Sequence, residues 1–512
     1  MAAVTPARAG LAICGLVGLF VALWPLGVTG DYMNHLARTH IEGAIWSDET
    51  LQQYYALSFS LIPDLTMDLI IPWLSQLTGT YAAGAVTVAM AFLAPPLAGM
   101  ALAKTVHGRV TWLSLAGFLT VFNVNMDWGF INFAASSGFA LLAFVLWIRM
   151  QPGPKRAVTF FFLGLFLAIN HALAFLLFGF LAAAWQAGLL MRGGKADILA
   201  YLRRDAFWDV IAALGGLLFI ALATQGADDL PRGTADFFSL EQKAYALSAG
   251  FEFHNRAIGI ALALIVLFGA GAAVRAGMVR FQPGMGFLSA ALLGLVILMP
   301  TSVLGIWGLH LRFSNILLIV FCAGITFVPS VSPRLRQAAT ALILCMGAVS
   351  FANGAVAMAR TNQDAGEVRQ VLKTLPSGAR TLTAYSGEID NYRFAMNAAS
   401  MAVIDRSAFV PGLFTNTSPV DVQPAFSALH LPQAQPLTQG QLARGKDLAL
   451  PASENGYWSR AYARGWPHHW DYILYFRRAD QPGLDDLPVC RVHTRGAFSL
   501  YRVGSCEDAR AN

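Results

Sequence analysis

Long apolar stretches alternate with short polar ones along the first 357 residues of the chain. A helix of about twenty apolar residues crosses the hydrocarbon core of a bilayer and satisfies its own backbone polar groups there. The pattern therefore predicts a polytopic α-helical membrane protein with about eleven transmembrane helices. The predicted spans are 11–29, 82–103, 110–126, 129–148, 157–170, 171–191, 207–224, 257–274, 285–302, 313–330 and 337–357.

Two of these spans have a second interpretation. The stretch 157–170 is short, so with 171–191 it also fits a re-entrant hairpin. The stretch 11–29 resembles a signal peptide, but it lacks a small-residue cleavage site and Asp31 follows it at once. We therefore interpret it as a transmembrane span.

The loop 30–80 is the longest one between predicted spans, and its pattern is helical. Apolar residues recur near the helical period from Asp31 to Trp46, and LQQYYALSF and DLTMDLIIPWLSQL follow. These segments predict amphipathic helices that lie along the outer membrane interface, with Tyr and Trp at headgroup depth. Asp64 and Asp68 are one helical turn apart, and we expect both to face water.

The pattern changes after residue 357, where we expect a transmembrane domain (1–357) to end and an α/β domain (358–512) to begin. A helix is predicted before the first strand, and the segment 411–456 is rich in Pro, Gln, Ser and Thr, which is typical of a long loop. The predicted elements are a helix at 363–375, strands in RTLTAYSG, MAVIDRSAF and WDYILYFRR, and a hairpin in VCRVHTRGAFSLYRVGSC.

Composition and charge support a membrane protein and set its orientation. The chain is 56% hydrophobic and 12% charged, whereas soluble domains carry about 25% charged residues. Lys and Arg gather in alternate loops, and cytoplasmic loops are the ones enriched in them, so the N-terminus is predicted to be cytoplasmic. The net charge of +6 forms no basic run with interleaved aromatics, and we expect no nucleic-acid partner.

The sequence lacks the motifs of several common kinds of nucleotide-binding and metal-binding site. It has no phosphate-binding glycine loop, no HExxH and no CxxC. The neighbours His468 and His469 do not face one site on a regular element, so no metal ligand is assigned. Cys490 and Cys506 flank the last hairpin and either form a disulfide or stay reduced.

Titratable residues cluster where the first span ends, in GDYMNHLARTHIEGAIW. Asp31 opens this stretch, and an acid at that depth is costly unless it has a partner or a chemical role. It either deprotonates an incoming hydroxyl or amine, or caps the helix that follows. His35 and Arg38 share its helix face and are candidate substrate contacts.

A span followed at once by an outer Asp, a loop of interfacial helices and an outer C-terminal α/β domain resembles the GT-C class of membrane glycosyltransferases. DYMNHLAR is also similar to the D-x-x-x-H-L-A-R opening of bacterial membrane proteins grouped near that class. Lipid A aminoarabinose transferases and protein O-mannosyltransferases share this architecture. The resemblance implies transfer of a sugar from a polyprenyl-phosphate donor to an envelope lipid, glycan or protein, usually with inversion.

The resemblance also implies roles for single residues. Asp31 corresponds to the catalytic base, and Asp127 in FNVNMDWGFIN is the candidate second acid. No Asp-Glu pair follows Asp31, so a divalent cation, Mg²⁺ or Mn²⁺, stays an open alternative to a metal-free site. Lys243 and Arg312 are the preferred contacts for the donor phosphate, followed by Arg256.

Each of these side chains has a structural alternative. Cations such as Arg256 can snorkel to lipid headgroups. A lone histidine among apolar residues, such as His171 or His310, is more often a hydrogen-bonded core group than a substrate contact. The asparagines around Asp127 can bind sugar hydroxyls or simply cap turns; they are Asn123, Asn125 and Asn132.

Three rival functions remain: a transporter or lipid flippase, a polysaccharide polymerase or ligase, and a non-catalytic envelope scaffold. Transporters usually show repeats and charges at mid-membrane, whereas here the charges gather at one face. We expect a multi-pass protein of the bacterial inner (cytoplasmic) membrane whose C-terminal domain is periplasmic. Aromatic and Arg residues in AYARGWPHHWDY either stack on acceptor sugars or pack between this domain and the membrane surface.

Overall fold

The computed structural model describes residues 5–58, 61–223, 239–303, 306–387, 391–415, 418–432, 434–446, 462–477, 480–504 and 506. The chain forms two compact units. Unit 1 holds residues 1–23, 61–66 and 86–357. Unit 2 holds residues 24–60, 67–85 and 358–512, so most of the outer loop groups with the C-terminal residues rather than with the transmembrane helices where we had placed it.

Within the described residues, seven helices are long and apolar enough to cross a membrane. Each contains a window of 18 residues that is apolar with few charges, as expected for helices in lipid. They are α1 (Pro6–Leu23), α5 (Thr80–His107), α7 (Ile131–Arg149), α9 (Ala172–Gly193), α11 (Ala206–Ala223), α13 (Arg256–Arg275) and α16 (Pro333–Leu372). Shorter helices occupy other predicted spans: α8 (Pro154–Asn170), α14 (Met285–Leu298) and α15 (Ser314–Gly324). The predicted polytopic helical fold is thus present.

The predicted span 110–126 is the exception, because it is not an α-helix. It holds the 3₁₀ helix η1 (Leu113–Thr120) and the short α6 (Val124–Asp127). Local side-chain bonds favour this course: Thr120 Oγ1 donates to the Gly117 carbonyl, and Asn123 Nδ2 donates to the Thr120 carbonyl. Such bonds compete with the regular helical ladder.

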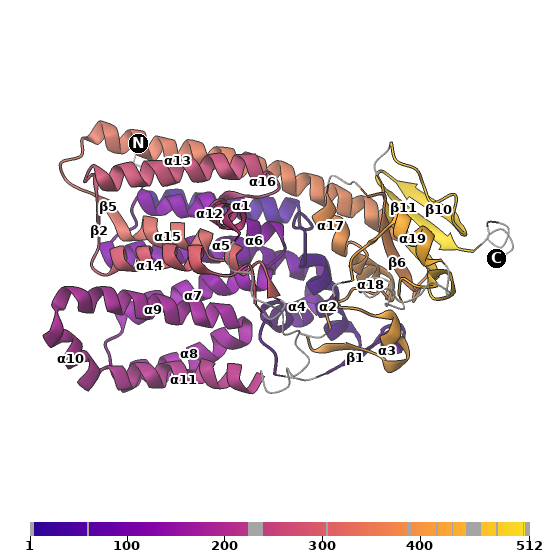
Figure 1. Ribbon diagram of the computed structural model, residues 1–512, viewed down its shortest axis with the longest axis horizontal. Helices are drawn as coiled ribbons and strands as arrows, with labels where there is room; N and C mark the ends of the chain where they lie inside the picture. The colour runs from indigo at the N-terminus through magenta and orange to yellow at the C-terminus, as the bar shows by residue number, and fades with distance from the viewer. Residues whose placement is uncertain are drawn as a thin grey trace. The chain divides into compact units, whose positions relative to one another are not determined.

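The helices of unit 1 pack through aromatic and small residues. Helices α8 and α11 lie side by side, and α7 packs on α9 (Figure 1). Phe160 and Phe178 stack with ring centroids 5.3 Å apart, and Trp147 packs edge-on against Phe160 at 4.9 Å. Large apolar side chains such as Phe268 are exposed, as lipid-facing residues of a membrane protein are.

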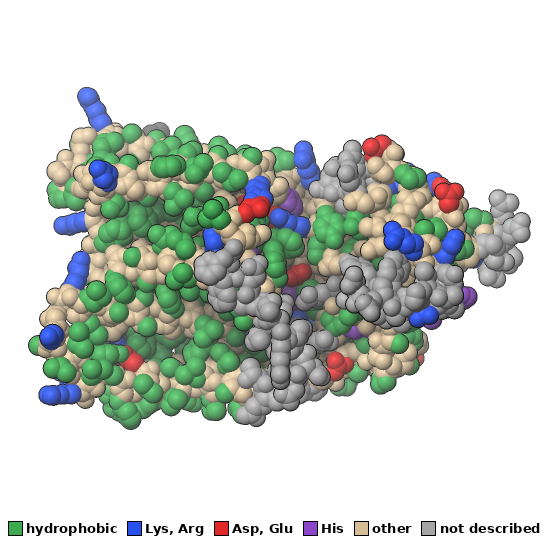
Figure 2. Space-filling view, in the orientation of Figure 1, with side chains coloured by type: hydrophobic (Ala, Val, Ile, Leu, Met, Phe, Trp, Pro, Cys, Tyr) green, Lys and Arg blue, Asp and Glu red, His purple; other side chains and the backbone are tan. Residues whose placement is uncertain are grey.

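One end of unit 1 gathers basic side chains. It carries α10 (Lys195–Arg204) and the two-stranded sheet of β2 (Val279–Phe281) and β5 (Ile325–Phe327). On the face shown in Figure 2, Lys and Arg side chains lie at this end and hydrophobic ones cover the helices. The remaining short elements of unit 1 are α12 (Leu240–Ser248), η2 (Ala249–Phe251), β3 (Ser302–Val303), β4 (Ile306–Trp307) and η3 (Leu309–Leu311).

The outer loop contains the helices that its pattern predicted. They are α2 (Tyr32–Ala44), α3 (Glu49–Tyr54) and α4 (Thr66–Thr78). LQQYYALSF is helical only up to Tyr54, after which β1 (Tyr55–Leu57) pairs with β7 (Val420–Val422). This pairing lies within unit 2.

The C-terminal residues form the expected α/β arrangement around a five-stranded sheet of order β10-β11-β9-β6-β8. β6 runs parallel to β8 and β9, and β9, β11 and β10 are antiparallel neighbours. The strands are β6 (Thr381–Tyr385), β8 (Leu437–Thr438), β9 (Tyr472–Phe476), β10 (Val489–Arg495) and β11 (Phe498–Val503). β6 and β9 are almost wholly buried, as central strands are, and α19 (Gln439–Gly445) contacts β6 and β8.

Two predictions for this region, the strand in MAVIDRSAF and the loop at 411–456, are wrong, and the predicted helix at 363–375 is confirmed up to Leu372. MAVIDRSAF is the helix α18 (Ser400–Arg406), because its apolar run packs on α2 rather than into the sheet. The helix predicted at 363–375 is the continuation of the 40-residue α16. The segment 411–456 holds β7, β8, α19 and η4 (Pro424–Leu429) in its described part, and residues 447–456 lie outside the described residues.

The C-terminal region also contains a disulfide bond and a buried aromatic segment. Cys490 and Cys506 form a disulfide bond. Trp466 and Trp470 of the aromatic segment are buried, each donating its ring N–H to a carbonyl, so they pack inside the domain, a place that neither interpretation of this segment had given them. The two remaining short helices are α17 (Tyr392–Asn397) and η5 (Trp466–His468).

Candidate active site

Asp31 lies in the turn that leads from the first span into α2. The preceding Gly30 has φ of 60°, a backbone conformation that glycine adopts at little cost. Asp31 itself has helical angles and occupies the N-cap position, yet its side chain makes no capping hydrogen bond. The carboxylate is partly exposed. The interpretation of Asp31 as a side-chain cap is therefore wrong.

Two buried asparagines hold this turn, and we call them the amide clasp: Asn34 on α2 and Asn397 at the end of α17. Asn397 Nδ2 donates to the Gly30 carbonyl at 3.0 Å, and its Oδ1 accepts from Asn34 Nδ2 at 3.1 Å. The Gly30 N–H donates to the Arg393 carbonyl at 3.1 Å. Both polar groups of Gly30 are thus bound by α17.

The rest of the clasp ties α2 to the loop after α18. Asn34 Nδ2 also donates to the Gly412 carbonyl at 2.7 Å, and Asn34 Oδ1 accepts from the Phe414 N–H at 2.7 Å. The Phe414 ring meets His35 edge-on, with centroids 5.2 Å apart. His35 is 7% exposed, so most of its surface is packed. Residues far apart in sequence thereby fix the backbone on both sides of Asp31.

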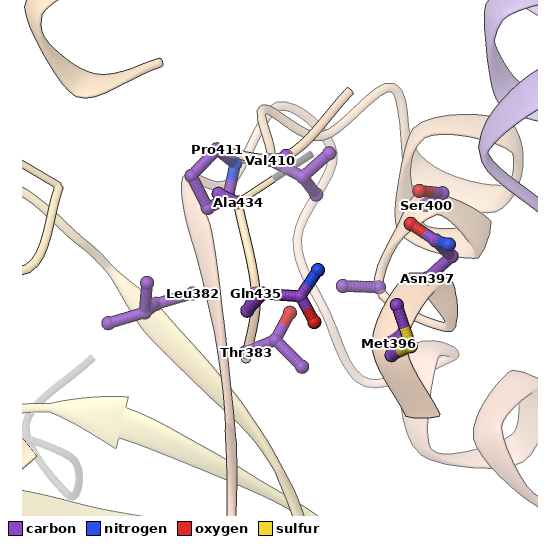
Figure 3. Close-up of a pocket in the computed structure, with 11 residues that line it drawn as sticks. Leu382, Thr383, Met396, Asn397, Ser400, Val410, Pro411, Ala434 and Gln435 are labelled. Carbon is purple, nitrogen blue, oxygen red and sulfur yellow. The ribbon is translucent and has the colours of Figure 1, made fainter. Parts of the chain in front are cut away.

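A small pocket adjoins the clasp in unit 2. Figure 3 shows Thr383 and Gln435 near one another, with Asn397 and Ser400 on the helical side. Its volume of about 20 Å³ holds about one water molecule, far less than a sugar ring needs. This pocket is therefore not a sugar subsite in the present conformation.

Arg38 is the centre of a buried charge cluster in unit 2. Its side chain is fully buried, with Nη2 2.5 Å from Asp68 Oδ2 and Nε 3.9 Å from Glu42 Oε1. The prediction that Asp68 faces water is thus wrong. Burial raises the pKa of Glu42 to about 10, and the Asp68 carboxylate adds to the rise. One guanidinium neutralises one of the two acids, so Glu42 keeps its proton at neutral pH.

In unit 1, Asp127 is bound to a histidine that the sequence analysis missed. Asp127 is fully buried, and its Oδ1 lies 2.6 Å from His254 Nδ1. Asp127 Oδ2 accepts a hydrogen bond from the backbone N–H of His254 at 3.2 Å. The nearby asparagines make structural bonds: Asn123 caps α6, Asn125 donates to the Arg312 carbonyl, and Asn132 donates to the Asp64 carbonyl.

A second group in unit 1 brings Arg312, His171 and Asp64 together. Arg312 Nη1 lies 3.2 Å from His171 Nε2, and Asp64 Oδ1 is 3.6 Å from the same nitrogen. The Arg312 guanidinium stacks over the Phe130 ring at 4.2 Å. His171 also caps α9, because its Nδ1 accepts from the Leu173 N–H. In this group the Arg312 guanidinium is held between the Phe130 ring and the His171 imidazole.

The other predicted cations lie around α12. Lys243 Nζ donates to the Met299 carbonyl. His310 is fully buried and bonds Gln242 Oε1 through Nε2 at 3.0 Å. The Arg256 side chain is 52% exposed, 3.8 Å from Glu241 and stacked over the Tyr245 ring at 4.7 Å. The predicted residues of unit 1 are therefore embedded in hydrogen bonds and ion pairs.

These groups show what the sequence could and could not reveal. The structure joins Arg312 to His171, which we had singled out separately, and to Asp64, which we had expected to face water. It also adds His254 and the amide clasp, which we had not named. In the structure both Asp64 and His254 have positive φ without being glycine (87° and 59°), a feature that the sequence pattern did not reveal. Among the described residues, no group of three or more His, Cys, Asp or Glu side chains is placed to hold a metal ion.

Comparison with known proteins bears on the fold. No protein-family model and no curated protein sequence matches the chain. The crystal structure of ArnT from Cupriavidus metallidurans bound to undecaprenyl phosphate is similar to it, with a TM-score of 0.53, 12% sequence identity and 97% of each chain covered. A likeness at this identity shows the fold alone. The chain therefore has the fold of ArnT over nearly its whole length, which confirms the fold of GT-C type predicted from its sequence.

Proposed function

We propose that this protein is a membrane glycosyltransferase that moves a sugar from a polyprenyl-phosphate donor to an acceptor outside the cytoplasm. The observation that carries the proposal is the ArnT fold, whose solved example holds undecaprenyl phosphate. It is supported by a carboxylate, Asp31, that follows the first span and does not cap the next helix. The acceptor is an envelope lipid, glycan or protein.

Asp31 acts as the general base in this proposal. It removes a proton from the acceptor hydroxyl or amine as that group attacks the anomeric carbon. The bond from this carbon to the phosphate oxygen breaks, and the electron pair stays on the phosphate. Attack from the side opposite to the leaving group inverts the anomeric centre. His35 and the amide clasp keep the Asp31 turn in place during this step.

The donor phosphate is bound by side-chain cations of unit 1. Arg312 is the preferred contact, since a guanidinium matches phosphate oxygens with paired donors, and its stack on Phe130 holds it in one direction. His171 positions Arg312. Lys243 and the half-exposed Arg256 supply further positive charge, and His310 orients α12 through Gln242.

The roles of Arg38 and of a divalent cation in this proposal differ from those considered from the sequence. Arg38 is sealed against Asp68, so we assign it a structural role rather than a phosphate contact. The described acids Asp64, Asp68 and Asp127 each face a cation or an imidazole and form no carboxylate cluster for a hard cation. We route no step through Mg²⁺ or Mn²⁺. Titration of the transfer assay with EDTA tests whether a divalent cation is needed.

We further propose a place in the bacterial inner membrane, with the N-terminus in the cytoplasm and the C-terminal domain in the periplasm. Two observations support this orientation. The disulfide between Cys490 and Cys506 is the kind of bond that persists in an oxidising compartment. The basic residues of unit 1 gather near α10, as expected of a cytoplasmic end (Figure 2).

The mass spectrum of envelope lipids and glycans from a deletion strain tests the proposal. The strain is complemented with wild type, with Asp31→Asn, or with Asp197→Asn, a control at an exposed acid on α10. We expect one sugar mass to disappear on deletion and to return with wild type and Asp197→Asn only. Full restoration by Asp31→Asn, at equal amounts in the membrane, would overturn the role of Asp31.

A further inference from the structure

The loop that carries His254 is fixed by several hydrogen bonds and a ring contact. It precedes α13, which Asn255 caps by accepting from the Ile258 N–H. Asn353 Nδ2 donates to the Phe253 carbonyl at 2.8 Å, and the Phe253 and His254 rings stack at 4.9 Å. His254 has a φ of 59°, which costs free energy in a non-glycine residue and persists only where its surroundings impose it.

Asp127 sets the state of the His254 ring. A fully buried carboxylate is stable only with a partner, and the 2.6 Å contact to Nδ1 supplies one. The bond requires hydrogen on Nδ1, and the negative charge of Asp127 favours the doubly protonated ring. The ring nitrogen away from Asp127, Nε2, then also carries hydrogen. The His254 side chain remains 22% exposed, so the ring can be reached from outside the protein.

We infer that His254 binds the phosphate group of the polyprenyl carrier as a cation, and that Asp127 is its positioning residue. This inference rests on the proposed function and adds a residue to it. During transfer the carbon–oxygen bond to the phosphate breaks, and the electron pair stays on that oxygen. The Nε2–H of His254 hydrogen-bonds the oxygen and offsets its growing charge, while Asp31 takes the acceptor proton. His254 itself ends the step unchanged, so no further reactant is required.

The rival explanation is a latch, in which Asp127 merely fastens the loop to α6. A latch predicts that loss of either side chain lowers stability and leaves ligand preference unchanged. A phosphate contact predicts that preference for a charged headgroup falls. The two explanations therefore differ in a binding measurement that does not depend on catalysis.

The experiment compares binding of undecaprenyl phosphate and of the uncharged alcohol undecaprenol to the purified full-length chain in detergent. We expect wild type to prefer the phosphate and His254→Gln to lose about tenfold of that preference, the order of a charge-assisted hydrogen bond. The control is His107→Gln, because this ring lies at the end of α5 and bonds the Ala323 carbonyl and the Gln282 side chain. It should behave as wild type.

Asp127→Asn provides a second, independent test. At pH 7.5 it should lose preference as His254→Gln does, because a neutral Asn no longer favours the protonated ring. At pH 6 it should regain part of that preference as the imidazole takes up a proton, whereas His254→Gln should not. If His254→Gln does not fold, this pH response of Asp127→Asn decides alone.

The outcomes separate the two proposals. If wild type binds the phosphate no better than the alcohol, the polyprenyl-phosphate donor is overturned. If wild type discriminates and both variants discriminate equally well, the donor class stands and His254 is a latch. Loss of discrimination in both variants, with partial recovery of Asp127→Asn at pH 6, supports the inference.

Discussion

The Asp31 turn and the His254 loop are both fixed by residues distant in the sequence, but through opposite chemistry. Neutral amides hold the turn: Asn34 and Asn397 bond each other and the backbone around Gly30. A contact between a carboxylate and an imidazole holds the loop, where buried Asp127 meets the His254 ring. Amides keep a geometry without changing the charge around a base. An acid beside a ring also sets the charge of that ring. The comparison suggests that one region supplies position and the other supplies positive charge.

The largest expected effect is loss of the Asp31 carboxylate, the proposed base. Asp31→Asn keeps a side chain of the same shape and leaves the amide clasp intact, so the fold should persist. We expect transfer to fall about a thousandfold, within the range for a general base. Initial rates of sugar transfer by the purified protein check this, with Asp197→Asn as control. A rate within tenfold of wild type would show that Asp31 only shapes the turn.

The charge cluster of unit 2 provides a contrast, because its buried ion pair takes no part in the proposed reaction. Asp68→Asn leaves the fully buried Arg38 without its closest anionic partner. We expect a loss of about 3–5 kcal/mol in the free energy of unfolding, as for other buried pairs broken from one side. Chemical denaturation in detergent measures this. An unchanged midpoint would mean that Glu42 ionises and takes over as the partner of Arg38.

Glu42 makes this cluster sensitive to pH. Its pKa is raised from 4.5 to about 10 by burial, so the folded state holds a proton that the unfolded state releases above pH 4.5. The stabilisation is complete below that pH and is lost as pH rises towards 10, by about 1.4 kcal/mol per pH unit at most. Glu42→Gln copies the protonated form and removes this dependence.

The melting temperatures of wild type and Glu42→Gln at pH 6 and pH 8.5 provide the measurement. We expect the variant to be the more stable protein, by a margin that grows with pH. A variant that is less stable than wild type by the same margin at both pH values would show that Glu42 is ionised in the folded protein and forms a salt bridge with Arg38.

The smallest expected effect concerns the amide clasp. Asn34→Ala and Asn397→Ala should each cost about 1–3 kcal/mol, because buried partners lose their hydrogen bonds. The double variant should cost less than the sum by about 0.5–1 kcal/mol, since the two side chains share one bond. Full additivity would show that the clasp is not a unit. Transfer rates of the folded single variants should fall through kcat more than KM, because the clasp positions Asp31.

Sequence patterns predicted what depends on local order and missed what depends on distant partners. Apolar runs indicated α1, α5 and the other long helices, and alternation indicated β6, β9 and the final hairpin. MAVIDRSAF misled, because its apolar run packs on α2 as a helix. The interpretation of 110–126 failed because local side-chain bonds favour a 3₁₀ course.

The same limit explains the site. Asp31 was recognisable because it follows a span directly. His254 and Asn397 were not, since the partner of each lies more than a hundred positions away, at Asp127 and Asn34. The pairing of Arg312 with His171 was missed for the same reason, although both residues had been singled out.

The most direct test of the central claim follows both products of one reaction. The purified protein is placed in lipid nanodiscs with a lipid extract from the deletion strain, and mass spectra are taken over time. We predict that free polyprenyl phosphate appears in step with one sugar mass gained by an acceptor, and that Asp31→Asn abolishes both signals. Sugar gain without release of polyprenyl phosphate, or no transfer by the folded wild-type protein, would contradict the account.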